Sequence, residues 1–216
     1  HLTVQLRGSA GQSLGAFAAQ GLRIELTGDA NDYVAKGLSG ATLVVRPSPH
    51  LAAPESNAIL GNTVLYGATS GRLFAAGRAG ERFAVRNSGA VTVVEGVGAN
   101  GCEYMTGGTA VILGPVGDNF AAGMTGGMAF VLDTDGRFER QVNMESVVLQ
   151  RLASPYWEGQ VRALVAEHAR ETGSRLAADL LREWDLRSRE LWQVCPREMI
   201  GRLAHPLGGE PVLERA

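Results

Sequence analysis

The chain has 216 residues, with little lysine, little cysteine and few aromatic residues. Lys36 is its single lysine, and the other basic residues are arginines scattered along the sequence. The formal net charge is −2, so charge gives no indication of a nucleic-acid or membrane-surface partner. No apolar run reaches the roughly 18 residues needed to span a bilayer. Composition therefore favours an ordinary folded domain without membrane or nucleic-acid contacts.

The two cysteines, Cys102 and Cys195, lie far apart and form no CxxC pair. Neither belongs to a Cys/His cluster with the spacing of metal ligands. We expect both to be small buried apolar groups in a reduced, cytoplasmic compartment, with a reactive thiol or a disulfide as the alternative.

The histidines and acidic residues do not assemble into a recognisable catalytic or metal site. The four histidines are His1, His50, His168 and His205. They are too scattered for a Ser/His/Asp or Cys/His constellation, and His168 is expected at a helix interface, with a catalytic role as the alternative. The group Asp29, Asn31 and Asp32 offers too few oxygen ligands for calcium and is read as a hydrogen-bonded corner. The sequence thus predicts no catalytic, cofactor-binding or metal-ligating residue.

A repeat of 19 residues runs through the glycine-rich middle of the chain. Its apolar members include Val93, Ile112 and Val131, and Met105 recurs as Met124. A period in this range is typical of stacked coils. The residues predicted to form corners and stacks are Gly89, Gly98, Asn100, Gly107, Gly108, Gly117, Asn119, Gly126 and Gly127.

Short β-rich segments separated by Gly, Asn, Asp and Ser predict a mainly β fold, a β-helix of about seven turns with a period of about 19–20 residues. A leucine-rich repeat is less favoured, because glycine and alanine stand where leucines are required. The expected strands are 4–6, 23–26, 42–45, 63–66, 73–76, 83–85, 92–94, 110–113 and 129–132. The proline-rich segment 47–54 is read as a loop thrown out from one coil, either a partner contact or a plain connector.

Composition changes near residue 140. Residues 1–138 hold 24 of the 29 glycines, whereas residues 139–216 hold 23 of the 42 charged residues. We therefore expect a β-helix domain over 1–140 and a helical C-terminal extension over 141–216 that packs on the β-helix or caps it. In the extension, Gly173 is predicted to end one helix and Ser174 to cap the next, and a further short helix is expected between 185 and 194.

The segment Gly96–Gly101 fits G-x-G-x-x-G, the pattern of a dinucleotide-binding loop. That loop must open a helix, but paired glycines and another β-rich run follow here. We read these glycines as corners, with a nucleotide site as the alternative.

Several long segments resemble the C-terminal (GXGXG, β-helix) domain of the large (α) subunit of glutamate synthase, over nearly the whole chain. They are 8–17, 28–40, 65–71, 80–90, 95–108, 119–127 and 143–145. The resemblance implies a right-handed, single-stranded β-helix followed by helices, and a scaffold without chemistry of its own. In the complete enzyme an amidotransferase domain releases ammonia from glutamine, and a channel carries it to an FMN-binding barrel where 2-oxoglutarate becomes glutamate.

The resemblance also implies partners and cofactors that lie outside this chain. Expected partners are the amidotransferase and FMN-binding domains and a small electron-transfer subunit or ferredoxin, and a homo-oligomer is possible. Expected cofactors of the parent enzyme are FMN and an iron–sulfur cluster, with none in this chain. Because the sequence starts as if mid-pattern, we expect a piece of a longer protein.

Two other classes stay open. One is a free-standing assembly or binding subunit, similar to a subunit of formylmethanofuran dehydrogenase. The other is a nucleotide-binding or carbohydrate-active enzyme built on a β-helix.

Overall fold

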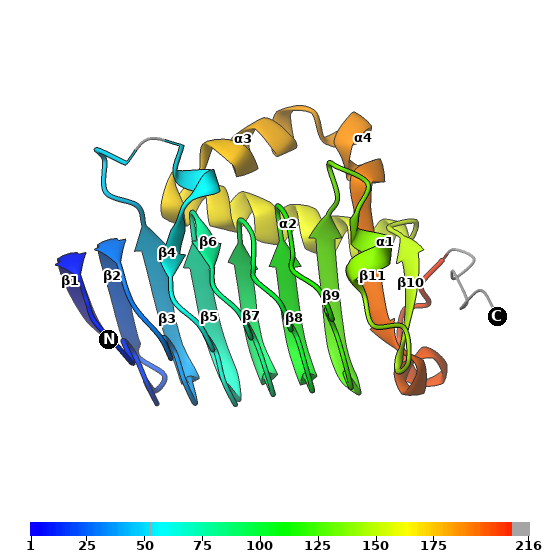
Figure 1. Cartoon of the computed structure of the whole chain (residues 1–216), viewed down its shortest axis with the longest axis horizontal. Coiled ribbons are helices and arrows are strands. Elements are labelled where there is room, and N and C mark those ends of the chain that lie inside the picture. The colour runs from blue at the N-terminus through cyan, green and yellow to red at the C-terminus, as the bar shows by residue number, and fades with distance from the viewer. Residues whose placement is uncertain (52, 209–216) are drawn as a thin grey trace.

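A computed structural model of the chain describes residues 1–51 and 53–208. Successive turns each contribute one strand to a parallel sheet, and the chain starts at one end of the stack and finishes at the other (Figure 1). The parallel strands, in spatial order, are β1 (Leu2–Ser9), β2 (Leu22–Asp29), β3 (Ser39–Arg46), β5 (Ser70–Ala75), β7 (Ser88–Val94), β8 (Thr106–Ile112) and β9 (Gly126–Leu132). The predicted β-helix is thus confirmed as a parallel β-solenoid.

Two strands from the C-terminal part extend the same sheet. β11 (Leu191–Pro196) pairs antiparallel with β9, and β10 (Val147–Arg151) pairs antiparallel with β11. The remaining elements are α1 (Phe138–Gln141), α2 (Pro155–Thr172), α3 (Arg175–Arg182), α4 (Trp184–Arg187) and the 3₁₀ segments Pro54–Ser56, Ser188–Glu190 and Arg197–Arg202. The β9 end of the sheet is therefore continued by β11 and β10.

The register follows the predicted period with one local difference. Ile112 pairs with Val131, 19 residues on, as predicted, but Val93 pairs with Val111 instead of Ile112. The prediction was wrong there because the β7–β8 register shifts between Ser88 and Val91. Such a bulge adds a residue to one strand and moves the pairs beyond it by one position.

The opposite side of each coil is not a second strand. The segments 63–66 and 83–85, predicted as strands, are turns in which every second residue has a positive φ: 59° at Thr63 and 61° at Leu65, then 60° at Arg82 and 57° at Ala84. These turns are still hydrogen-bonded between coils: the Thr63 N–H donates to the Glu81 carbonyl, and the Ala84 N–H donates back to the Val64 carbonyl. Each coil is therefore joined to its neighbours on both sides.

The proline-rich segment leaves the stack, as expected. Thr42 pairs with Arg72, a separation of 30 residues where neighbouring turns are separated by 19 or 20. After this detour, β4 (Ala58–Leu60) pairs in parallel with β6 (Arg78–Ala79) in a small second sheet. The third turn thus carries a loop without disturbing the strand sequence of the stack.

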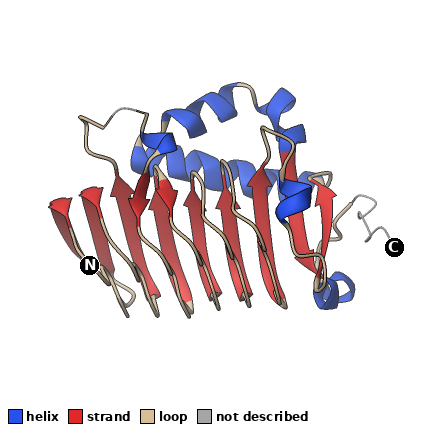
Figure 2. Cartoon of the chain, in the orientation of Figure 1, coloured by secondary structure: helices blue, strands red, loops and turns tan. Residues whose placement is uncertain are grey.

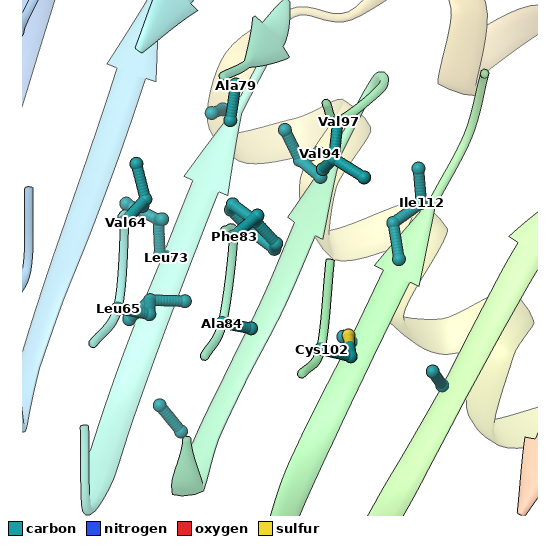
Figure 3. Packing of buried hydrophobic residues seen from close by; sticks show 14 of the residues in the cluster. Val64, Leu65, Leu73, Ala79, Phe83, Ala84, Val94, Val97, Cys102 and Ile112 are labelled. Carbon is teal, nitrogen blue, oxygen red and sulfur yellow. The ribbon is translucent and has the colours of Figure 1, made fainter. Parts of the chain in front are cut away.

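The interior of the coils forms one apolar core. Strand residues such as Leu73 and Ile112 have side chains directed toward residues of the opposite turns, such as Phe83 and Cys102 (Figure 3). All four are fully buried. Because side chains alternate along a strand, every second residue faces this core and the others face outward.

The outward residues form a second core under the helices. Val44, Phe74 and Val111 lie on the outer face of the sheet, and Val161 and Val165 of α2 pack in the same cluster. Helix α2 contacts β3, β5, β7 and β8, so it lies across the strands along the stack (Figure 2). The helices therefore cover a long face of the solenoid.

The C-terminal elements confirm some predictions and correct others. Gly173 ends α2 with φ 73°, and the Ser174 hydroxyl caps α3 by accepting from the Ala177 N–H. The helix expected between 185 and 194 is wrong beyond 190, because Leu191–Pro196 is a fully buried strand paired on both sides. The strand β10 was not predicted. The boundary at 140 stays a prediction, and residues 209–216 of the expected extension lie outside the described residues.

Candidate functional site

The predicted asparagine stack is present and longer than expected. The Asn119 side-chain amide donates to Asn100 Oδ1 at 2.8 Å. The Asn143 amide then donates to Asn119 Oδ1 at 2.9 Å, which adds a third rung. Asn143 was quoted in the sequence only as part of a motif, and its different spacing of 24 residues hid it from the repeat. These exposed amides join three consecutive turns along one corner.

The predicted corner glycines lie where neighbouring coils approach most closely. A Cβ at Gly107 would lie 2.2 Å from the Ser88 carbonyl oxygen, and one at Gly126 would lie 2.0 Å from that of Thr106. Neither of these two glycines has a positive φ, so it is the distance between coils that excludes a side chain.

The other predicted glycines follow the same rule. Gly108 and Gly127 combine a positive φ with a close backbone neighbour. Gly89, Gly98 and Gly117 are excluded from carrying a side chain by close backbone contacts alone. Met105 and Met124, the other predicted stack, are both buried in the inner core.

A buried polar cluster lies where α2 meets the end of β7. His168 of α2 is fully buried, and its Nε2 lies 3.4 Å from Glu95 Oε1. The Ser174 hydroxyl donates to the same Glu95 oxygen while accepting from the Ala177 N–H. His168 thus lies at a helix interface, as expected. Because Ser174 bonds Glu95 and not the histidine, the three residues do not form a Ser–His–acid relay.

Glu95 and Ser174 were not predicted as partners of His168. Glu95 lies 73 residues before the histidine, so no local pattern connects them. The available signal was an acidic residue placed directly after the apolar run of β7. A buried carboxylate is costly unless it is hydrogen-bonded, which makes this cluster a structural requirement of the helix position.

A cavity of about 370 Å³ opens beside this cluster. Its wall includes Glu95 and Ser174, the rim residue Arg175, and apolar side chains such as Pro47 and Leu176. The loop of the third turn and the α2–α3 corner therefore enclose it together. Its volume falls in the usual range of small-molecule sites.

Both thiols are buried and free, as predicted. Burial raises the pKa of Cys102 to about 12 and that of Cys195 to about 11. The two lie in different cores, Cys102 inside the coils and Cys195 under the helices. Since iron–sulfur clusters are held by several thiolates at one place, this chain does not offer their ligands.

The G-x-G-x-x-G segment stands in a corner context. Residues 96–101 lead through turns into β8, and no helix begins there. Gly98 lies against the backbone of Glu81 in the adjacent coil. In residues 1–51 and 53–208, no three His, Cys, Asp or Glu side chains gather as a metal site, and no helix is long and apolar enough to cross a membrane.

Charged residues tie the C-terminal end of α2 to the first turns. Arg23 bonds Glu25 at 2.6 Å and also bonds Glu171. The hydrogen bond from Arg23 lowers the pKa of Glu25. Burial opposes ionisation of Glu171, but bonding to Arg23 outweighs it, so the pKa of Glu171 is also lowered. Arg46 completes the link by donating to the Glu171 carbonyl at 2.9 Å.

Comparison with known proteins gives relatives that are all much longer than this chain. Over 208 residues, it is 62% identical to the glutamate synthase [NADPH] large chain of Azospirillum brasilense, covering 96% of this chain and 14% of the relative. It is 52% identical to the ferredoxin-dependent glutamate synthase of Pyropia yezoensis (88% of this chain, 12% of the relative). It is 47% identical to the glutamate synthase [NADPH] large chain of Bacillus subtilis (94% and 14%).

The chain thus spans about one seventh of the length of these relatives. A family model described as the GXGXG motif matches residues 1–197, which hold all of the solenoid and the helices α1 to α4. This chain therefore belongs to the GXGXG motif family.

Proposed function

We propose that this chain is a non-catalytic scaffold domain of a glutamate synthase large subunit. It would support glutamine-dependent reductive amination of 2-oxoglutarate by holding the amidotransferase and FMN-binding domains in fixed positions. In this proposal FMN and the iron–sulfur cluster reside in other domains of the parent enzyme. Electrons arrive from a small subunit or from ferredoxin, since relatives of both the NADPH and the ferredoxin type are known by name.

One observation carries the proposal: the chain is 62% identical over 96% of its length to a segment making up 14% of a glutamate synthase large chain. The solenoid architecture supports the mechanical role. Each coil is hydrogen-bonded to its neighbours through both the sheet and the alternating turns. Ammonia transfer between two sites requires a fixed distance, and a stack bonded on two sides resists bending.

The test replaces the corresponding segment of the Azospirillum brasilense large chain with this chain. Glutamate formation from glutamine and 2-oxoglutarate should be retained in the chimera. This chain alone should show neither glutaminase turnover nor flavin absorbance. Turnover or bound flavin in the isolated chain would contradict the non-catalytic assignment, and an intact but inactive chimera would contradict the scaffold role.

A further inference from the structure

The cavity at the α2–α3 corner contains a carboxylate that the fold does not fully use. Glu95 is 2% exposed, and both of its side-chain hydrogen bonds, from Ser174 and His168, go to Oε1. Oε2 has no partner among the described residues, yet it is not sealed from solvent. Because Glu95 lines the cavity, Oε2 is the atom free to meet a ligand there.

The hydrogen bonds at Oε1 fix which way the carboxylate points. The Ser174 hydroxyl accepts from the Ala177 N–H as the cap of α3, so its own hydrogen is directed to Glu95. The second partner, His168, is held in α2, where Thr172 bonds its carbonyl at 2.6 Å. The free oxygen is therefore held rigidly, which is the arrangement that favours a hydrogen-bond donor of positive charge.

The rest of the wall sets the class of ligand. The charged lining residues are Glu95, Glu55 and Arg175, two acids against one base. Apolar side chains make up much of the remaining wall: Pro47, Pro49, Leu51, Ala76 and Leu176. A site of this kind fits a compact molecule that combines a cationic group with an apolar body.

We propose that this cavity binds a small organic cation, a primary ammonium or guanidinium group on an apolar body, with the cation on Glu95 Oε2. The site is independent of the scaffold role. A lysine side chain of a partner protein offers the same chemistry, and we assign the site to a free small molecule because the cavity is bounded by the 47–56 loop and by α3.

The test uses the whole chain and benzylammonium as the probe, followed by chemical-shift titration of the backbone amides. Benzylammonium should shift the amides of residues 172–176 and 95–96, and neutral benzyl alcohol should bind at least about tenfold more weakly. Glu95→Gln keeps the shape and the acceptor for Ser174 but removes the charge, and it should weaken benzylammonium binding by about ten- to a hundredfold. Glu81→Gln is the matched control, because its exposed side chain lies outside the cavity lining, and it should leave the affinity unchanged.

A second variant keeps the carboxylate, in case Glu95→Gln disturbs the fold. Ser48→Trp places a large ring at the exposed loop position that lines the cavity and should block the probe while Glu95 stays intact. Equal affinity for benzylammonium and benzyl alcohol, or unchanged benzylammonium affinity in folded Glu95→Gln or Ser48→Trp, would overturn the proposal. Tighter binding of N-acetyl-lysinamide than of benzylammonium would overturn the small-molecule assignment in favour of a partner's lysine.

Discussion

Single backbone atoms decide which residues the stack tolerates. Gly126 lies so close to Thr106 that a β-carbon would lie 2.0 Å from its carbonyl oxygen and 2.6 Å from its carbonyl carbon. Neither backbone atom can rotate away as the end of a side chain can. The requirement for glycine is therefore one of space between coils, although sequence reasoning would first consider a positive φ.

We expect Gly126→Ala to lower the free energy of unfolding by about 3 kcal/mol or more, the upper end for overpacking, because two coils must separate. Urea unfolding followed by circular dichroism measures it. Gly159→Ala is the control, since a Cβ at this exposed position of α2 meets nothing within 4 Å. It should raise stability by about 0.5–1 kcal/mol through helix propensity. Equal stability of Gly126→Ala and wild type would contradict the close approach.

Residues that repeat identically could be predicted, and residues that depend on a distant partner could not. Asn100 and Asn119 were placed correctly because identical amides one period apart favour a ladder. Thr63 and Leu65 were misread, since β-branched and apolar residues in a short run indicate a strand. Their positive φ values depend on hydrogen bonds to the coils on both sides. The contact between Glu95 and His168 was invisible for the same reason of distance.

At the scale of elements, α2 is fixed to the sheet by a buried apolar face and by a charged link at its C-terminal end. Leu180 and Trp184 of the following helices extend the apolar face. The link consists of Arg23, Glu25, Arg46 and Glu171. Helices α2 and α3 could be predicted from their 3.6-residue period and their capping residues. β11 could not, because its strand character comes from β9 and β10 on either side.

The charged link should make stability depend on pH. The pKa of Glu171 is lower in the folded chain than its ordinary value of 4.5, so its contribution is present above that value and is lost as pH falls through the folded pKa. We expect Glu171→Gln to be less stable than wild type by about 1 kcal/mol at pH 7, with the difference shrinking toward pH 3.

Urea unfolding of both proteins at several pH values measures this difference. Glu198→Gln serves as the control, because this exposed glutamate lies far from the link in the 3₁₀ segment Arg197–Arg202, and its effect should be small at every pH. A difference for Glu171→Gln that stays constant from pH 7 to pH 3 would show that the link does not act through charge.

At the scale of the whole molecule, the two cores report on different parts of the fold. Cys102 lies in the core inside the coils, and Cys195 lies in the core between sheet and helices. Burial raises both pKa values well above the ordinary range, so neither thiol is ionised near neutral pH. Reaction with a thiol reagent therefore requires that the corresponding core opens.

Both thiols should react with an aromatic disulfide reagent at pH 8 about a thousandfold or more slowly in the native chain than in urea, because native domains are unfolded only to a fraction of about 10⁻³ or less. Cys102→Ala and Cys195→Ala each leave one thiol, so the two rates are measured separately. Rapid reaction of either thiol in the native chain would show that its core opens easily.

The detour of the third turn has a practical consequence for anyone who redesigns this protein. The strand pairs on either side of it, β2 with β3 and β5 with β7, keep the ordinary separation although β3 and β5 are 30 residues apart. Local lengthening is therefore absorbed at the bend and does not propagate along the axis. Epitopes or reporter peptides could be grafted at this bend, and one-residue insertions inside a strand, which reverse the faces of its side chains, should be far more harmful.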